Sequence, residues 1–156
     1  MKTLAIAAAA FLAATAAANA EPFSFMGTGQ VTNEVQAVGP QGRPVGASFS
    51  TTESQTQWAS GKKSSSKGTC ANWTVPPSSG GITSNGACAL TDSDGGAFSL
   101  SFACAAADAK NTMANCWGGM TGTSGAYQGK TGTISWRIKI GAGGKSSTSA
   151  GSGQWY

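Results

Sequence analysis

Few side chains in this chain of 156 residues could perform acid–base or metal chemistry, and none of them is a histidine. A Ser-His-Asp triad, a Cys-His pair, a histidine-ligated zinc or iron site and histidine-ligated haem all require that side chain. General acid–base catalysis would depend on six Asp and Glu residues, whose positions show no evident pairing. The composition therefore excludes a histidine-dependent hydrolase and does not favour hydrolytic or redox chemistry.

The four cysteines are Cys70, Cys88, Cys104 and Cys116. An even number in an exported chain predicts disulfides, for which three pairings exist. We favour Cys70–Cys88 and Cys104–Cys116, because sequence neighbours on consecutive strands approach each other most easily. Each bridge would close a short loop and stabilise the fold by about 3 kcal/mol in the chain-entropy model. A four-thiolate metal site is the weaker alternative, because the spacing contains no Cys-x-x-Cys pair.

The N-terminus has the pattern of an export signal. Lys2 precedes an apolar run over residues 4–14, and the small residues Ala18 and Ala20 form a cleavage site before Glu21. The run is too short for a membrane anchor, and no stop-transfer charges follow it. The sequence therefore predicts a cleaved signal peptide over residues 1–20, a single mature domain over residues 21–156, and a periplasmic or secreted location without a membrane span.

Alternating apolar and polar residues predict strands in the mature chain. Charged residues make up only 10% of the sequence, and glycine is abundant, which disfavours long helices. In the clearest strand Phe98, Leu100 and Phe102 share one face, and in another Ile134, Trp136 and Ile138 do so. The predicted strands are a first long strand of Phe23, Phe25 and 28–38, then 45–58, 69–75, 87–91, 98–104, a Gly-rich strand from Cys116, and 131–140.

Three segments outside these strands are predicted to be loops or flexible. The cluster Lys62, Lys63 and Lys67 lies in a predicted loop. We favour a solvated loop over a contact for an anionic polymer, and expect no nucleic-acid binding, because no aromatic residues are interleaved. Residues 105–115 are the only place for a short helix, although their composition favours a loop. Residues 141–152 are of low complexity and are predicted to be flexible.

The segment Asp92-Ser93-Asp94-Gly95 has two readings. It resembles the start of a calcium loop, but its twelfth position is Ala103 instead of the usual Glu. Asp-Gly between two strands also favours a hairpin turn. We therefore predict a hairpin and no metal site.

About eight strands joined by turns, without crossover helices, predict an all-β fold. The expected architecture is an antiparallel β-barrel of about eight strands, and the alternative is a sandwich. A closed barrel leaves no exposed sheet edges, so we favour it.

Candidate ligand-binding residues are aromatic side chains near strand ends and charged side chains within strands. The aromatic group can rim a cavity or cap the barrel, and it consists of Trp58, Trp73, Trp117 and Trp155. A fifth tryptophan, Trp136, is instead expected in the core. The second group, Glu34, Glu53 and Arg137, supplies polar groups to a pocket if these side chains point inward, and otherwise faces water.

The stretch from Gly122 to Gly132 carries a family resemblance. Its glycines permit sharp bends, and Tyr127 would fill the space that they leave. The stretch resembles the Gly-rich signature of the allene oxide cyclase and dirigent superfamily at Gly122, Gly125, Tyr127, Gly129 and Gly132, with departures at 123, 124 and 130. The resemblance implies an eight-stranded barrel with an apolar cavity, association into dimers or trimers, and cyclisation or coupling of hydrophobic molecules without a cofactor.

Together these features predict an exported barrel that binds an apolar or aromatic small molecule. Its expected ligand-binding residues are Glu34, Glu53, Trp58, Trp73, Tyr127 and Arg137. If the protein is an enzyme, an isomerase or cyclase-like reaction without a cofactor is expected, and a homo-oligomer is compatible with the resemblance. The alternatives are a module that binds a macromolecule, such as a hydrolase inhibitor or envelope-associated domain, and a structural protein without a site.

Overall fold

Eight long strands dominate the computed structural model, which describes residues 20–38, 44–75 and 81–156. The predicted signal peptide therefore lies outside the described residues except for Ala20. The strands are β1 (Glu21–Val38), β2 (Pro44–Trp58), β3 (Lys63–Thr74), β4 (Ile82–Asp92), β5 (Ala97–Ala106), β6 (Met113–Ser124), β7 (Thr131–Ile140) and β8 (Ser146–Trp155). The described ranges also contain two 3-10 turns, η2 (Gly125–Tyr127) and η3 (Ala142–Gly144).

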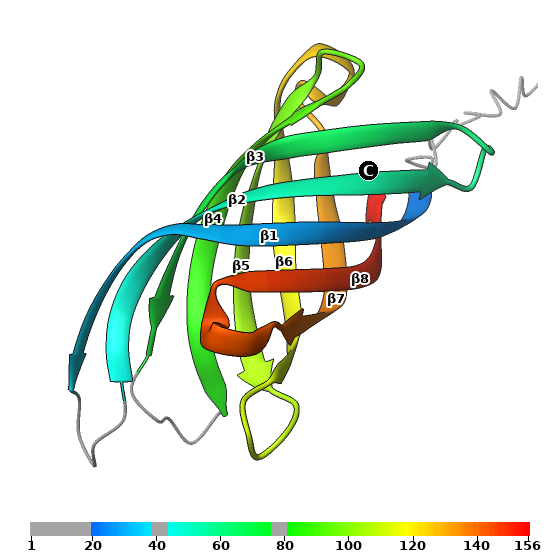
Figure 1. Cartoon of the computed structure of the whole chain (residues 1–156). Helices are drawn as coiled ribbons and strands as arrows, with labels where there is room; N and C mark the ends of the chain where they lie inside the picture. Colours follow the sequence, from blue (N-terminus) through cyan, green and yellow to red (C-terminus); the bar gives the residue numbers. More distant parts are fainter. Residues whose placement is uncertain (1–19, 39–43, 76–80) are drawn as a thin grey trace, which may run out of the picture.

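The strands form a closed antiparallel barrel in sequence order (Figure 1). Each strand pairs with its sequence neighbours, and β1 also pairs with β8 from Glu21 opposite Trp155 to Gln30 opposite Ser146. This pairing closes the sheet and satisfies the edges that an open sheet would leave exposed. The predicted all-β barrel of about eight strands is confirmed.

Period-two alternation separates the inner from the outer face of each strand. On β7 the side chains of Ile134, Trp136 and Ile138 line the interior, whereas Arg137 and Lys139 lie outside. On β2 the alternation places Ser50, Thr52 and Ser54 inside, and Thr51 and Glu53 outside. The interior is therefore lined by small polar residues on β2 and by large apolar residues on β7.

The two ends of the barrel differ. At one end the start of β1 lies beside the end of β8, and at the other β1 and β2 extend past β8 and curve away from it (Figure 1). Beyond Gln30, β1 pairs only with β2, as in Glu34 opposite Ser48. The interior is therefore covered by all eight strands near the chain termini and by fewer at the opposite end.

Both disulfides join directly opposite residues of consecutive strands. Cys70 of β3 bonds to Cys88 of β4, and Cys104 of β5 bonds to Cys116 of β6. All four half-cystines are buried on the inner face of the barrel. The two predicted pairings are confirmed.

One sequence-based expectation about a loop is corrected, and another agrees with the structure. Lys63 and Lys67 belong to β3 instead of a loop, because the strand begins at Lys63 and buries the intervening Ser64 and Ser66. Residues 107–112 form the loop that the composition of 105–115 favours. β5 runs to Ala106 and β6 starts at Met113, and the Asp108 carboxylate accepts hydrogen bonds from the backbone N–H groups of residues 112 and 113.

The prediction of a flexible segment over residues 141–152 is corrected as well. Residues 142–144 form η3, and β8 begins at Ser146. β8 pairs with β1 on one side and β7 on the other, because a closed barrel gives every strand two neighbours. In the described ranges no helix has both the length and the apolar character needed to cross a membrane.

Candidate ligand-binding lumen

The interior of the barrel contains a cavity of about 550 Å³ to which every strand contributes side chains. Small-molecule sites in proteins range over roughly 300–1,000 Å³. The cavity is therefore large enough for a ligand of a few hundred daltons. Below, this cavity is called the lumen.

One wall of the lumen is apolar. Along β5 the inward residues are Phe98, Leu100 and Phe102, and β7 adds Trp136 and Ile138. The rings of Phe102 and Trp136 meet edge to face with centroids 5.4 Å apart, an arrangement that aromatic pairs prefer. This wall offers large apolar surfaces whose burial against a ligand would be favourable.

The opposite wall is lined by hydroxyl groups. Every inward residue of β2 from 48 to 56 is Ser or Thr: Ser48, Ser50, Thr52, Ser54 and Thr56. β8 adds Ser147 and Ser149. The Ser54 and Ser66 hydroxyls lie 2.8 Å apart, and the Asn72 amide donates to Ser50 Oγ at 3.4 Å. The lumen thus presents hydrogen-bonding groups on one side and hydrocarbon on the other.

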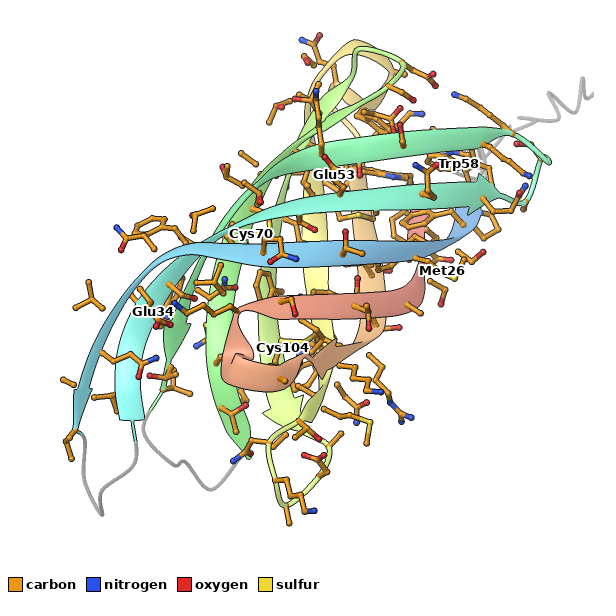
Figure 2. All side chains as sticks on the ribbon, in the orientation of Figure 1. Met26, Glu34, Glu53, Trp58, Cys70 and Cys104 are labelled. Carbon is orange, nitrogen blue, oxygen red and sulfur yellow. A yellow bond between two sulfur atoms is a disulfide. The ribbon has the colours of Figure 1, made fainter. Side chains whose placement is uncertain are left out.

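Aromatic rings close the end of the lumen where the termini meet, and we call them the aromatic floor. It consists of Phe23, Trp58, Phe98, Tyr127 and Trp155. Their ring centroids lie 4.8–6.4 Å apart, with Tyr127 to Trp155 the shortest and Trp58 to Tyr127 the longest of these contacts. Figure 2 shows Trp58 at the end of β2, beside the start of β1. The floor makes the lumen a blind tube.

A buried carboxylate ties the floor together. Asp92 is only 5% exposed, and its Oδ2 accepts hydrogen bonds from Ser64 Oγ at 3.0 Å and from the Tyr127 hydroxyl at 3.1 Å. The Trp58 indole N–H donates to Ser64 Oγ at 3.1 Å. Burial, followed by the nearby Asp92 carboxylate, raises the pKa of Tyr127 well above its usual value. Tyr127 therefore stays protonated and acts as a hydrogen-bond donor at neutral pH.

The turn after Asp92 confirms the predicted hairpin. The Gly95 N–H donates to the Asp92 carbonyl at 2.9 Å, and the Asp94 N–H donates to Asp92 Oδ1 at 3.0 Å. Gly95 has a φ of +83°, which glycine adopts without strain. The Asp92 carboxylate thus caps its own turn with one oxygen and holds the floor with the other.

The Gly-rich stretch positions Tyr127 in the floor. A Cβ at Gly122 would lie 1.6 Å from the Tyr127 carbonyl oxygen, and Gly125 has a φ of +60° with Gly96 Cα 2.8 Å from such an atom. Only glycine fits at these two positions, so the chain can fold back and insert the Tyr127 ring beneath the barrel. The structural role predicted for these glycines is in keeping with this packing.

Charge is confined to the two ends of the lumen. Among its lining residues in the described ranges only Asp92 and Lys145 carry a charge. Asp92 is engaged in the floor, and Lys145 is exposed near the open end. The middle of the lumen is therefore neutral.

Two of the six predicted ligand-binding residues lie at the lumen. Trp58 and Tyr127 line its floor. Trp73 is 45% exposed on the outer face of β3, and it contributes nothing to the lumen lining. Its position follows from Cys70 and Asn72, which take the inward positions of that strand.

The charged candidates also lie outside the lumen, which corrects the expectation that they supply polar groups to it. Glu53 and Arg137 are exposed on the outer face and border a second hollow with Met26. Glu34 lies on the curved extension of β1 and is exposed (Figure 2). An unpaired charge within the barrel would be costly, and Ser and Thr supply the polar groups of the lumen instead.

Asp92, the buried charge of the site, is not among the ligand-binding residues predicted from the sequence. The sequence predicts only that Asp92 belongs to a hairpin turn. In the structure its carboxylate both caps that turn and accepts hydrogen bonds from Ser64 and from Tyr127 of the floor. Among the described residues, no three Asp, Glu, Cys or His side chains are grouped in a way that could hold a metal ion. The arrangement is that of a cavity with two chemically different walls and with charged lining residues only at its ends, among the described residues.

Comparison of the chain with protein families and with curated proteins finds no match.

Proposed function

We propose that the protein binds an apolar or aromatic small molecule in the lumen. The observation that supports this proposal best is the cavity of about 550 Å³ between an apolar wall and a closed aromatic floor. Protein interiors are normally close-packed, with few voids larger than a water molecule. A barrel that served only as a scaffold would be expected to fill this space with side chains.

A role in guiding cyclisation or coupling extends this proposal. It derives from the resemblance of residues 122–132 to the allene oxide cyclase and dirigent signature. Such a role needs a lumen that holds a flexible substrate in one conformation, and it needs no cofactor. The fixed aromatic floor and the neutral walls support it, because they would restrain a hydrophobic substrate without adding charge. The homo-oligomer that the resemblance implies is tested by light scattering.

The proposed site of action is the periplasm or the outside of the cell. Two disulfides join β3 to β4 and β5 to β6. Disulfides persist in oxidising compartments, and this agrees with the signal peptide that residues 1–20 predict.

The macromolecule-binding alternative receives less support. It predicted a filled barrel and a concentrated basic patch over residues 62–67. The barrel contains a cavity, and Lys62 forms an ion pair with Asp94. Lys63 and Lys67 are spread along the outer face of β3.

Native mass spectrometry of protein purified from its own host without reductant tests the proposal. The expected result is an adduct of roughly a few hundred daltons that is lost on denaturation. Ser50 and Thr51 are neighbours on β2 that point inward and outward. Ser50→Trp should therefore abolish the adduct, and Thr51→Trp should retain it. An adduct that survives Ser50→Trp unchanged would show that the ligand binds elsewhere.

A further inference from the structure

A group of four hydroxyls on the polar wall is arranged around two inward-facing glycines. On β1 Gly27 pairs with Ser54 of β2 and Ser149 of β8. Gly29, two residues further, pairs with Thr52 of β2 and Ser147 of β8. Directly opposite residues share one face of a sheet. The four hydroxyl side chains therefore flank a strip of β1 that carries no side chain, and we call this group the hydroxyl trough.

The trough is shallow because the serines lean toward the glycine backbone. A Cβ at Gly29 would lie 2.7 Å from Ser147 Oγ, and a Cβ at Gly27 would lie 3.1 Å from Ser149 Oγ. A side chain at Gly29 would displace the Ser147 hydroxyl, and a side chain at Gly27 would also meet the Glu53 carbonyl oxygen, 2.8 Å from its Cβ. Two residues along a strand and two strand spacings across it give the trough an extent of about 7 Å by about 10 Å.

The hydroxyls of the trough keep hydrogen-bonding capacity for a ligand. Thr52 Oγ1 donates to the Thr28 carbonyl at 3.1 Å, and Ser54 shares one hydrogen bond with Ser66. A hydroxyl has one donor and two acceptor sites, so each retains at least one acceptor site. A wholly apolar ligand would cover these groups without replacing their bonds to water, which is unfavourable.

The apolar wall begins directly beside the trough. Ile138 and Ile140 of β7 pair with Ser149 and Ser147 of β8. At the level of the trough, polarity therefore changes across the lumen. A fatty acid is polar at one end only, so it would leave most hydroxyls of the trough without a hydrogen-bond partner. A molecule with polar groups along one edge and hydrocarbon along the other matches both walls.

We infer that the occupant of the lumen is an uncharged molecule with several hydroxyl or carbonyl groups along one edge, which the hydroxyl trough binds while the apolar wall covers the opposite edge. The inference rests on the proposed function, because it specifies the ligand class of the same lumen. The neutral middle of the lumen provides no partner for an ionised group, and the only lining cation of the described residues, Lys145, is exposed near the opening. Buried ions without a partner are strongly disfavoured.

Three steroids of one skeleton test the inference by isothermal titration calorimetry on the wild-type protein. Methyl cholate is uncharged and has three hydroxyls on one face, methyl cholanate has none, and cholanic acid has a carboxylate but no hydroxyl. We expect methyl cholate to bind about tenfold more tightly than methyl cholanate, because two or more net hydrogen bonds account for a factor of that size. Cholanic acid should gain nothing over methyl cholanate.

A pair of variants on β8 connects this preference to the trough. Ser147→Ala/Ser149→Ala removes two inward hydroxyls and should reduce the advantage of methyl cholate to about twofold or less. Thr148→Ala/Ser152→Ala removes two hydroxyls from the exposed face of the same strand, and it should leave the advantage unchanged.

The outcomes separate this inference from the proposed function. Equal affinity for methyl cholate and methyl cholanate, or tightest binding of cholanic acid, would overturn the inference and leave the binding function intact. Binding of the uncharged dye Nile red without binding of any steroid would likewise overturn the inference and leave the binding function intact. Failure of Nile red and of all three steroids would overturn both.

Discussion

Tyr127→Phe is the most informative single substitution, because it removes one hydroxyl from the aromatic floor and keeps the ring. Tyr127 is 6% exposed, and its hydroxyl donates to Asp92 Oδ2 at 3.1 Å. The ring packs against Trp155 and Phe98 with centroid distances of 4.8 and 5.3 Å. These contacts persist in the variant, so the change isolates the hydrogen bond to the carboxylate.

The expected cost is that of a hydrogen bond to a charged acceptor. Such bonds contribute about 1.5–3 kcal/mol, and Asp92 keeps its bond from Ser64. We therefore expect the free energy of unfolding to fall by about 2 kcal/mol, measured by urea denaturation at pH 7. For a domain of this size the melting temperature should fall by roughly 5–10 °C.

Tyr156→Phe is the matched control, because the chain contains only two tyrosines. Tyr156 is 45% exposed, and an exposed substitution of this kind changes stability by less than about 0.5 kcal/mol. An equal loss of stability in the two variants would refute the role assigned to the floor network.

The same hydroxyl predicts how stability depends on pH. Burial and the Asp92 carboxylate raise the pKa of Tyr127 in the folded protein, so the unfolded chain releases this proton at a lower pH. The contribution of Tyr127 to stability is thus complete below about pH 10 and declines above it, by up to about 1.4 kcal/mol per pH unit. Tyr127→Phe should lack this decline, and Tyr156→Phe should retain it. An identical alkaline profile in Tyr127→Phe and the wild type would contradict the assignment.

Two further predictions concern the frame around the lumen. Cys70→Ala/Cys88→Ala should reduce the free energy of unfolding by about 3 kcal/mol, measured by urea denaturation, and a loss below about 0.5 kcal/mol would contradict the disulfide's expected contribution. Gly122→Ala should destabilise the protein by more than about 2 kcal/mol, because its Cβ would lie 1.6 Å from the Tyr127 carbonyl oxygen. Gly119→Ala on the same strand, where the nearest atom is 3.9 Å away, should be nearly neutral; equal thermal shifts in the two variants would refute the packing argument.

Hydrophobic alternation made the apolar half of the barrel predictable from sequence. Along β7, Ile134, Trp136 and Ile138 alternate with polar residues, and the contrast fixes which face is buried. The disulfide pairings followed from the same pattern, because cysteines on consecutive antiparallel strands become direct neighbours.

The polar half could not be predicted in the same way. Inward and outward positions of β2 are both polar over most of its length, so hydropathy does not distinguish Glu53 from Ser54. Counting back in steps of two from the buried Trp58 identifies Ser54 as inward and Glu53 as outward. The pattern alone leaves Glu53 a candidate pocket group, because it does not show that Trp58 points inward.

β8 was missed for a related reason. Its residues 146–153 are Ser, Thr, Ala and Gly on both faces, a composition that is typical of linkers as well as of this strand. What makes the segment a strand is the need of β1 and β7 for a second partner. That requirement is a property of the whole barrel and has no local signal. The hydroxyl trough, half of which lies on β8, was therefore not predictable from local pattern.

The lumen is proposed to bind a small uncharged molecule, and equilibrium titration with the uncharged dye Nile red measures such binding. We expect saturable binding of one dye per barrel, which Ser50→Trp abolishes and Thr51→Trp preserves. Absence of saturable binding by the wild type, or equal binding by the two variants, would contradict it.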